Sequence, residues 1–358
     1  MIPIFWPSGP KLKWQILFSL YKVFRGRWWG QGPLVDKFDK KFGEHFGYDY
    51  CVSTNSGSSA LELAYRLAGI TDGDKVLTPV FTCTATNIPL KRMGAKIEFV
   101  DVNPRTWCMD LEDFRNKVKG AKAIVTVNVG GIMCSKEIYQ IAKKAGIPVI
   151  VDAAQSLGIT EPRGDFICYS FQGIKHFTTG DGGMLVTRDE YSYNRAKRLR
   201  WFGIDREAKK RNGWNPYKDR KMIVDIEEPG YKFHMNDIQA AMGLVGLKNT
   251  DKLLKHRIRI ANIYNKGIPN HHKVFGGSCW LFGVEVENRD KVSAKLLERG
   301  IETNVVQLRN DIFSVFGGRR RKMPHMNRLE QKYLYLPIHS KMSLRDAKYI
   351  VKEFNKLT

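Results

Sequence analysis

The chain has 358 residues, of which 43% are hydrophobic, so it is long enough for two packed domains and its composition excludes a disordered or fibrous protein. Its 59 lysines and arginines exceed the 36 acidic residues, which gives a formal net charge of +23. Such an excess favours anionic partners, among them nucleic acids, membrane surfaces and phosphorylated metabolites. The basic runs at 209–211 and 319–322 lack the interleaved aromatic residues of a single-strand groove, so we expect no nucleic-acid partner.

The six cysteines lie far apart and form neither a CxxC motif nor a cluster with histidine. We therefore expect reduced thiols, no metal site and a cytoplasmic protein. In the N-terminal region, Trp14, Tyr21 and Phe24 recur at helical spacing with lysines between them, within an apolar run too short to span a membrane. This pattern predicts an amphipathic helix packed on the body of the protein or on a partner, without stable membrane insertion. A helix lying on a membrane surface is the alternative.

Strand and helix patterns alternate from residue 34 to residue 152. We expect helices at 34–46, from residue 60, at 84–93, 111–118 and 136–145, and strands at 50–53, 75–79, 96–100, 123–127 and 148–152. Such alternation, with valine- and isoleucine-rich strands, predicts an α/β fold with a largely parallel sheet covered on both faces. Ligands of such sheets bind beyond the carboxyl ends of the strands. Asp152 stands at one of these ends and Gln155 in the turn that follows.

The second half of the chain has a different pattern. Residues 203–230 are rich in charge, glycine and proline and suggest a loop, whereas 235–268 predict one long helix joining two domains. Strands at 279–287, 302–307 and 333–337 and helices at 289–299 and 344–357 predict a small α+β domain, with Ser343 and Asp346 as a capping box for the last helix. We therefore predict a large domain at 1–250 and a small C-terminal domain at 251–358.

A single lysine, Lys175, stands between two apolar runs and just before the turn TTGDGG. The glycines of that turn can take positive φ and reverse the chain into a strand from residue 184. A lysine that forms a Schiff base needs a neutral amine in a fixed position, which a partly buried strand-turn-strand provides. An ordinary surface lysine beside a hairpin is the alternative interpretation of this stretch alone.

A second polar stretch, NSGSSALELA from residue 55, opens directly into an apolar helix. The N-terminus of a helix that follows serine and glycine presents N–H groups and hydroxyls to an anion, so Gly57 and Ser58 are candidate phosphate ligands. A plain serine N-cap explains the stretch equally well.

Together with Asp152 and Gln155, these features supply what pyridoxal phosphate chemistry requires. The phosphate needs helix N–H donors and hydroxyls, the pyridine nitrogen needs a carboxylate that keeps it protonated, and the aldehyde needs a lysine. The motif SFxxxK, with Ser170 and Lys175, completes the set.

The sequence resembles the DegT-type sugar aminotransferases, which are fold-type I pyridoxal phosphate enzymes acting on nucleotide-linked keto sugars. The resemblance covers nearly the whole chain and rests on the motifs WWGQGPLVDKFDKKF, NSGSSALELA, TPVFTCTATN, IVDAAQSLG, YSFQGIKHFTTGDGGM, RWFGIDRE, GYKFHMNDIQAAMGL and YLPIH. It implies that the cofactor is held by Gly57, Ser58 and Ser170 at the phosphate, Asp152 at the pyridinium nitrogen, Gln155 at the ring hydroxyl and Lys175 in the Schiff base.

The resemblance also implies a homodimer in which a loop of one subunit, here residues 230–236, reaches the site of the other. Many members have GYNYR in this loop, whereas this chain has Lys232 and His234 at the positions of the asparagine and the arginine. Lys232 is the candidate contact to the partner's cofactor phosphate, and His234 is a candidate substrate-binding residue. Cys83 stands where many members place an aromatic residue over the cofactor ring. Because Lys175 is kept, the family's dehydratase branch, which has histidine there, is disfavoured.

The implied reaction moves an amino group from an amino acid, by resemblance L-glutamate, to a nucleotide-linked keto sugar and yields an amino sugar for a surface polysaccharide or related glycan. Arg309 and the run 319–322 are candidate contacts to substrate phosphate, with a solvated basic loop as the alternative. Two other functions stay open at this point. One is a fold-type I enzyme that acts on an amino acid alone, and the other is a non-catalytic basic binding protein.

Overall fold

The structure is a computed structural model that describes residues 1–26, 28–158, 161, 163–207, 226–268 and 279–358. The basic run at 209–211 and most of the loop expected at 203–230 lie outside the described residues. In the part of the chain that is described, no helix combines the length and the apolar character needed to cross a bilayer. The cysteines are thiols, as expected, and Cys83 is the exposed one.

A seven-stranded sheet forms the centre of the molecule, with strand order β1-β7-β6-β5-β4-β2-β3. Strand β7 runs antiparallel to both of its neighbours, and the other neighbouring pairs are parallel. The strands are β1 (Tyr50–Thr54), β2 (Lys75–Pro79), β3 (Lys96–Val100), β4 (Ala123–Val127), β5 (Val149–Asp152), β6 (Phe166–Ser170) and β7 (Gly183–Thr187). The predicted α/β fold with a mostly parallel sheet is therefore confirmed.

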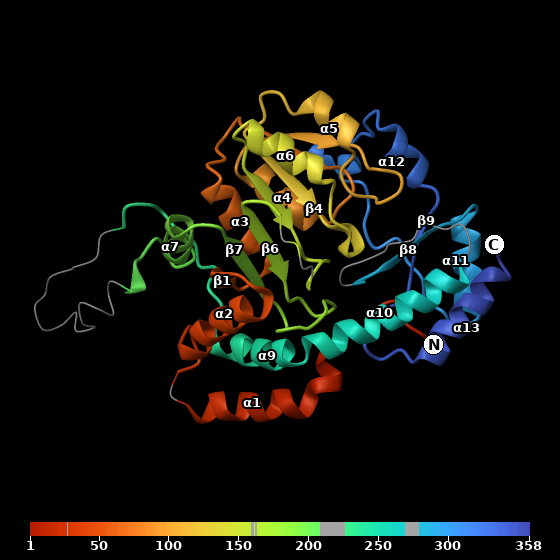
Figure 1. Ribbon diagram of the computed structural model, residues 1–358, viewed down its shortest axis with the longest axis horizontal. Coiled ribbons are helices and arrows are strands. Elements are labelled where there is room, and N and C mark those ends of the chain that lie inside the picture. The colour runs from red at the N-terminus through yellow and green to blue at the C-terminus, as the bar shows by residue number, and fades with distance from the viewer. Residues whose placement is uncertain (27, 159–160, 162, 208–225, 269–278) are drawn as a thin grey trace, which may run out of the picture.

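Each face of this sheet has its own hydrophobic core, because successive side chains of a strand point to opposite faces. In β4, Ile124 belongs to one core and its neighbour Val125 to the other. Helices α2 (Pro33–Phe46), α5 (Leu111–Lys117) and α6 (Lys136–Lys144) contribute to the first core, and α3 (Gly57–Leu67), α4 (Thr84–Arg92) and α7 (Glu190–Leu199) to the second. The sheet is thus covered on both faces, as predicted (Figure 1).

The long helix predicted at 235–268 is wrong in one respect, because it consists of two helices, α9 (Asp237–Lys248) and α10 (Thr250–Gly267). Asn249 separates them with φ −104° and ψ 1°, outside the helical region. Its side-chain amide donates to the carbonyl of Val245 at 2.8 Å, and the Thr250 hydroxyl donates to that of Gly246 at 3.0 Å. These side chains compete with the backbone donors of a continuous helix. Figure 1 shows α9 beside the sheet and α10 leading away from it.

The C-terminal region packs around a third core, which runs from Ile260 to Phe354. Its elements are β8 (Phe282–Glu285) paired antiparallel with β9 (Tyr333–Leu336), and helices α11 (Arg289–Glu298) and α13 (Leu344–Asn355). Helix α12 (Pro324–Leu329) instead buries Met326 and Leu329 in the first core. The capping box of Ser343 and Asp346 is confirmed. The strand predicted at 302–307 is wrong: only isolated bridges form at Ile301 and Asn304, and the Asn304 side chain accepts the next backbone N–H at 2.7 Å.

The division into domains at 1–250 and 251–358 stays a prediction, which the helix break at Asn249 and the separate C-terminal core favour. The first residues of the chain nevertheless contact the C-terminal region. Ile2 pairs with Ile301, and the carbonyl of Pro3 contacts a ring nitrogen of His339 at 2.9 Å. The amphipathic helix expected near the N-terminus is confirmed as α1 (Lys13–Arg25), which packs on α9.

Candidate active site

A cavity of about 370 Å³ lies beyond the carboxyl ends of β5 and β6. Its wall includes the six residues that were predicted to hold the cofactor within one subunit, namely Gly57, Ser58, Asp152, Gln155, Ser170 and Lys175. They come from three separate stretches of the sequence, and the parallel strands bring these stretches to one edge of the sheet. The structure therefore assembles the predicted constellation in one place, and the role of each residue remains a prediction.

The N-terminus of α3 forms one wall of this cavity. Ser56 caps the helix by accepting the backbone N–H of Ser59 at 3.1 Å, so the plain N-cap that the sequence allowed is present. The helix also approaches β6 closely: a Cβ added to Gly57 would lie 2.8 Å from the Cβ of Ser170. A Cβ on Gly183 would lie 2.4 Å from the carbonyl oxygen of Ser56. Glycine at both positions places helix N–H groups and serine hydroxyls together at the cavity, the arrangement that binds an anion.

Asp152, at the end of β5, is a buried carboxylate held in a fixed orientation. One oxygen accepts the Thr86 hydroxyl at 2.7 Å, and the other accepts the backbone N–H of Ala154 at 3.0 Å. Thr86 in turn lies 2.8 Å from the Thr82 hydroxyl. Burial raises the pKa of Asp152, while the Thr86 hydrogen bond and the charge of Lys175 lower it. A buried carboxylate in this position is suited to pair with a cationic group inside the cavity.

Lys175 follows β6 in a short turn in which its backbone N–H donates to the carbonyl of Gln172 at 2.9 Å. The turn TTGDGG then reverses the chain, with Gly180 at φ +84°, and β7 begins at Gly183, one residue earlier than expected. Burial lowers the pKa of the Lys175 ammonium to about 8, although Asp152 and Cys83 oppose the shift. A substantial fraction of this amine is neutral near pH 8, as a nucleophilic lysine requires.

Trp280, which sequence reasoning missed, lies directly over this lysine. The Lys175 Nζ is 3.7 Å from the centre of the indole ring. The indole N–H donates to the carbonyl of Ile174 at 2.9 Å, Phe5 stacks on the ring at 5.8 Å, and the buried Arg257 donates to the Trp280 carbonyl at 3.1 Å. The segment SCWLFG carries no motif that points to this role, because the contact depends on how the C-terminal region docks.

Gln155 is held in the turn after β5, where its side-chain oxygen accepts the backbone N–H of Gly130 at 2.9 Å. Cys83 also lines the cavity, at the position where the resemblance suggested an aromatic residue. Val306 and Gln307 reach the same cavity from the C-terminal region. The cavity is therefore bounded by the central sheet on one side and by the C-terminal region on the other.

Lys232 and His234 are not among the described residues that line this cavity. Their segment runs beside the start of α3, where the carbonyl of Phe233 accepts the backbone N–H of Asn55 at 2.8 Å. The exposed Lys232 ammonium lies 4.1 Å from the centre of the Trp201 ring. The His234 ring packs on the same tryptophan at 3.9 Å, and burial together with nearby cations lowers its pKa to about 4. Both side chains thus lie outside the subunit's own cavity.

The structure does not support Arg309 as a contact to substrate phosphate. Its guanidinium is fully buried and makes a bidentate pair with Asp311 at 2.7 and 2.8 Å. It also donates to Asn327 at 2.5 Å and to Glu330 at 3.2 Å. The sequence could not reveal this role, because Glu330 is 21 residues away. Arg309 therefore connects segments within the C-terminal region rather than facing a ligand.

The neighbouring basic run at 319–322 is partly engaged in the same network. Arg320, mostly exposed, pairs with Glu330 at 2.9 Å, and the backbone N–H of Arg321 donates to Asp311 at 2.7 Å. These contacts favour the alternative interpretation of a solvated basic loop with local partners.

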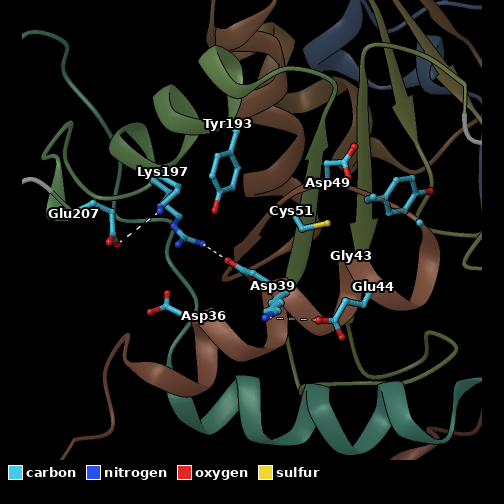
Figure 2. A pocket seen from close by; sticks show the side chains of 13 residues that line it. Asp36, Asp39, Gly43, Glu44, Asp49, Cys51, Tyr193, Lys197 and Glu207 are labelled. Carbon is cyan, nitrogen blue, oxygen red and sulfur yellow. Dashed lines mark hydrogen bonds and ion pairs between the residues drawn. The ribbon is translucent and has the colours of Figure 1, made fainter.

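A second cavity, of about 580 Å³, lies between α2, β1 and α7 and is the larger of the two. Figure 2 shows five acidic residues around it: Asp36, Asp39, Glu44, Asp49 and Glu207. Several are paired with cations, since Asp39 contacts Arg200 at 3.3 Å and Glu207 contacts Lys197 at 3.7 Å. Burial raises the pKa of its cysteine, Cys51, so the thiol is not activated. The smaller cavity, which holds the low-pKa lysine, is the better candidate for chemistry.

Comparison with known proteins identifies relatives over nearly the whole chain. The model of the DegT/DnrJ/EryC1/StrS aminotransferase family matches residues 11–355. The GDP-perosamine synthase of Escherichia coli O157:H7 is 30% identical, with 91% of this chain and 90% of that protein aligned. The sugar aminotransferase CalS13 of Micromonospora echinospora superposes with a TM-score of 0.87 at 27% identity, over 99% of this chain and all of that one.

The cofactor is also found among the solved relatives. The PLP form of Spr1654, described as a putative sugar aminotransferase of Streptococcus pneumoniae, superposes with a TM-score of 0.88 at 25% identity and covers 99% of this chain and 98% of that chain. The matched residues, 11–355, include every residue that lines the smaller cavity. This chain therefore belongs to the DegT/DnrJ/EryC1/StrS family of pyridoxal phosphate-dependent aminotransferases.

Proposed function

We propose that the protein transfers an amino group from an amino acid, with L-glutamate as the expected donor, to the keto group of a nucleotide-linked sugar. We propose further that it works as a homodimer in the cytoplasm. The main support for the proposed catalysis is the environment of Lys175. Its pKa is lowered to about 8, and it lies in a cavity that also contains a buried carboxylate and a helix N-terminus. The substrate class is supported by the relatives, one of which is named for a GDP-linked product and another as a sugar aminotransferase.

The residues present fit pyridoxal phosphate. The close approach of Gly57 to Ser170 leaves the start of α3 open to a phosphate, with the hydroxyls of Ser58 and Ser170 on the same wall. Asp152 offers a buried carboxylate to a protonated ring nitrogen, and Lys175 offers the amine for the aldehyde. Gln155 stands in the turn between β5 and the cavity and would face the ring hydroxyl.

The bound cofactor supplies an electron sink that stabilises negative charge at the α-carbon of the amino donor. The protein's part is to place and move protons. Asp152 would keep a proton on the ring nitrogen, because its orientation is fixed by Thr86 and the Ala154 N–H. Lys175 Nζ, which is neutral in a substantial fraction of molecules near pH 8, would take the α-proton of the donor and later deliver a proton to the sugar carbon. Trp280 covers this amine and excludes water from one side.

The acceptor would enter between the central sheet and the C-terminal region, where Val306 and Gln307 line the cavity. The net charge of +23 favours the approach of a diphosphate-linked substrate. The dimer is supported by the position of Lys232 and His234. Both side chains lie outside the subunit's own cavity, and they belong to the segment 230–236, which by family resemblance reaches the partner's site.

The test is a pair of half-reactions with the protein loaded with pyridoxal phosphate. L-glutamate should yield 2-oxoglutarate and shift the visible absorbance band to that of the amino form of the cofactor, after which a nucleotide-linked keto sugar should restore the original band. Lys175→Ala should abolish both changes, and Lys348→Ala, an exposed lysine of α13, should leave them intact. Turnover of amino donors without amination of any keto sugar nucleotide would favour an enzyme that acts on amino acids alone. Absence of a borohydride-sensitive band would refute the catalytic proposal.

A further inference from the structure

Helix α1 has one buried face and one exposed aromatic face. Ile16 and Val23 are buried where the helix packs against α9. The opposite face exposes five large apolar side chains with relative exposures between 49% and 72%, namely Trp14, Leu17, Phe18, Tyr21 and Phe24. Their spacing of three or four residues places them in one stripe along the helix. Figure 1 shows α1 at the outer edge of the molecule, on the side of α9 away from the sheet.

Cationic side chains border this aromatic stripe. The ammonium of Lys13 lies 5.1 Å from the centre of the Trp14 ring, that of Lys22 lies 4.3 Å from the Phe18 ring, and the guanidinium of Arg25 lies 5.8 Å from the Tyr21 ring. The sequence contains no aspartate or glutamate before Asp36. The exposed face of α1 is therefore aromatic and purely basic, without acidic partners from its own segment.

We propose that this face, defined by Trp14, Leu17, Phe18, Tyr21 and Phe24 with the cations around them, docks on the surface of a bilayer that contains anionic lipid. A helix lying in the interface buries its apolar side chains at the level of the headgroups while lysine and arginine contact lipid phosphates. Trp14 and Tyr21 favour that depth because the indole N–H and the phenol hydroxyl are polar while the rings are apolar. The helix lies on the membrane and does not cross it, since α1 has only 13 residues.

A second copy of the chain is a poorer occupant of the same face. Two copies of α1 would bring two basic stripes together without an acidic residue of either segment to offset them. A 13-residue helix is also only about 20 Å long and about 10 Å wide, whereas a standard interface buries about 800 Å² per partner. An anionic surface complements the charge and accepts the aromatic side chains, so the observations favour lipid over self-association through α1.

The test is co-sedimentation of the full-length protein with vesicles. Vesicles of phosphatidylglycerol and phosphatidylcholine should bind the protein at low salt, pure phosphatidylcholine vesicles should bind it far less, and added salt should weaken the binding. Trp14→Ser/Phe18→Ser should lower the partition coefficient on anionic vesicles by roughly tenfold or more, because two large side chains no longer enter the interface. Lys13→Gln/Lys22→Gln should lower it by a similar factor.

Two matched controls accompany these variants. Leu297→Ser/Val315→Ser removes exposed apolar side chains elsewhere, and Lys348→Gln/Lys352→Gln removes exposed charges of α13; both should bind as the wild type does. Because the substituted side chains are exposed, we expect all of these variants to fold, and circular dichroism checks this. Equal binding by the α1 variants and the controls would overturn the proposal, as would failure of the wild type to bind anionic vesicles. Conversion of a dimer to a monomer by Trp14→Ser/Phe18→Ser in analytical ultracentrifugation would show that a second copy covers the face instead.

Discussion

The Nζ of Lys175 lies 3.7 Å from the centre of the Trp280 ring, so the lysine that follows β6 is covered by a side chain from the C-terminal region. This contact has two opposite effects on the lysine. The ring favours the charged amine electrostatically, whereas the burial to which it contributes favours the neutral amine. Burial dominates, since the pKa of Lys175 is lowered to about 8. The docking of the C-terminal region thus helps to set the protonation state of the candidate catalytic amine.

Trp280→Ala should raise the pKa of Lys175 toward the ordinary lysine value, because water then reaches the ammonium and the lost ring contact is the smaller effect. Trp280→Phe should keep the pKa close to that of the wild type, because an aromatic ring still covers the amine. The pKa is measured on cofactor-free protein from the pH dependence of acylation of Lys175, followed by mass spectrometry. An unchanged or lower pKa in Trp280→Ala would contradict the role of Trp280 as a positioning residue.

Lys175→Met should stabilise the cofactor-free protein near pH 7. The folded-state pKa of about 8 lies below the unfolded value of about 10.4, so between these values the unfolded chain binds more protons and stability rises with pH. The destabilisation of the folded state by the buried Lys175 ammonium is therefore fully present below about pH 8 and is lost by about pH 10. We expect the variant to gain roughly 2 kcal/mol at pH 7, less than the full shift implies because the side chain is partly exposed. Urea unfolding at pH 7 and pH 10 measures this, and a pH-independent difference would exclude the mechanism.

Gly57→Ala should weaken cofactor binding and destabilise the protein by about 1–3 kcal/mol, because the new Cβ would lie 2.8 Å from that of Ser170 and would push α3 away from β6. Gly9→Ala serves as the control, since its Cβ would meet the Thr178 side chain at an ordinary 3.6 Å. Titration of each variant with pyridoxal phosphate and urea unfolding without it separate the two effects. Wild-type affinity in Gly57→Ala would show that the phosphate does not use this helix start.

Arg309→Met should destabilise the protein by about 3–5 kcal/mol, because Asp311 would remain buried without its cationic partner. Arg320→Gln, which removes a mostly exposed partner of Glu330, should cost less than about 1 kcal/mol. Thermal unfolding of the two variants provides the comparison. If Arg309→Met instead kept wild-type stability and raised KM for the sugar nucleotide alone, the residue would contact substrate after all.

Local patterns predicted most of the central fold. The sequence predicted the C-terminal ends of four strands correctly, at Pro79, Val100, Val127 and Asp152. The apolar run of each strand is short and lies next to a segment with clear helical periodicity. The errors lie where side chains override the pattern. Asn249 divides a stretch with continuous helical spacing into two helices, and the Asn304 side chain bonds its neighbouring backbone in place of a strand ladder. Such competition depends on the rotamers that tertiary packing selects.

The sequence by itself predicted the candidate cofactor-binding constellation, because Gly57, Ser58, Asp152, Ser170 and Lys175 stand at a helix start, at strand ends and in the turn after β6, which a mostly parallel sheet brings to one edge. Only the tertiary structure decided what surrounds them. Trp280 reaches Lys175 from 105 positions away in the chain (280 − 175), and Arg309 lies buried against acidic residues rather than open to a ligand. These contacts depend on how the C-terminal region docks against the sheet, a long-range arrangement that no local periodicity encodes.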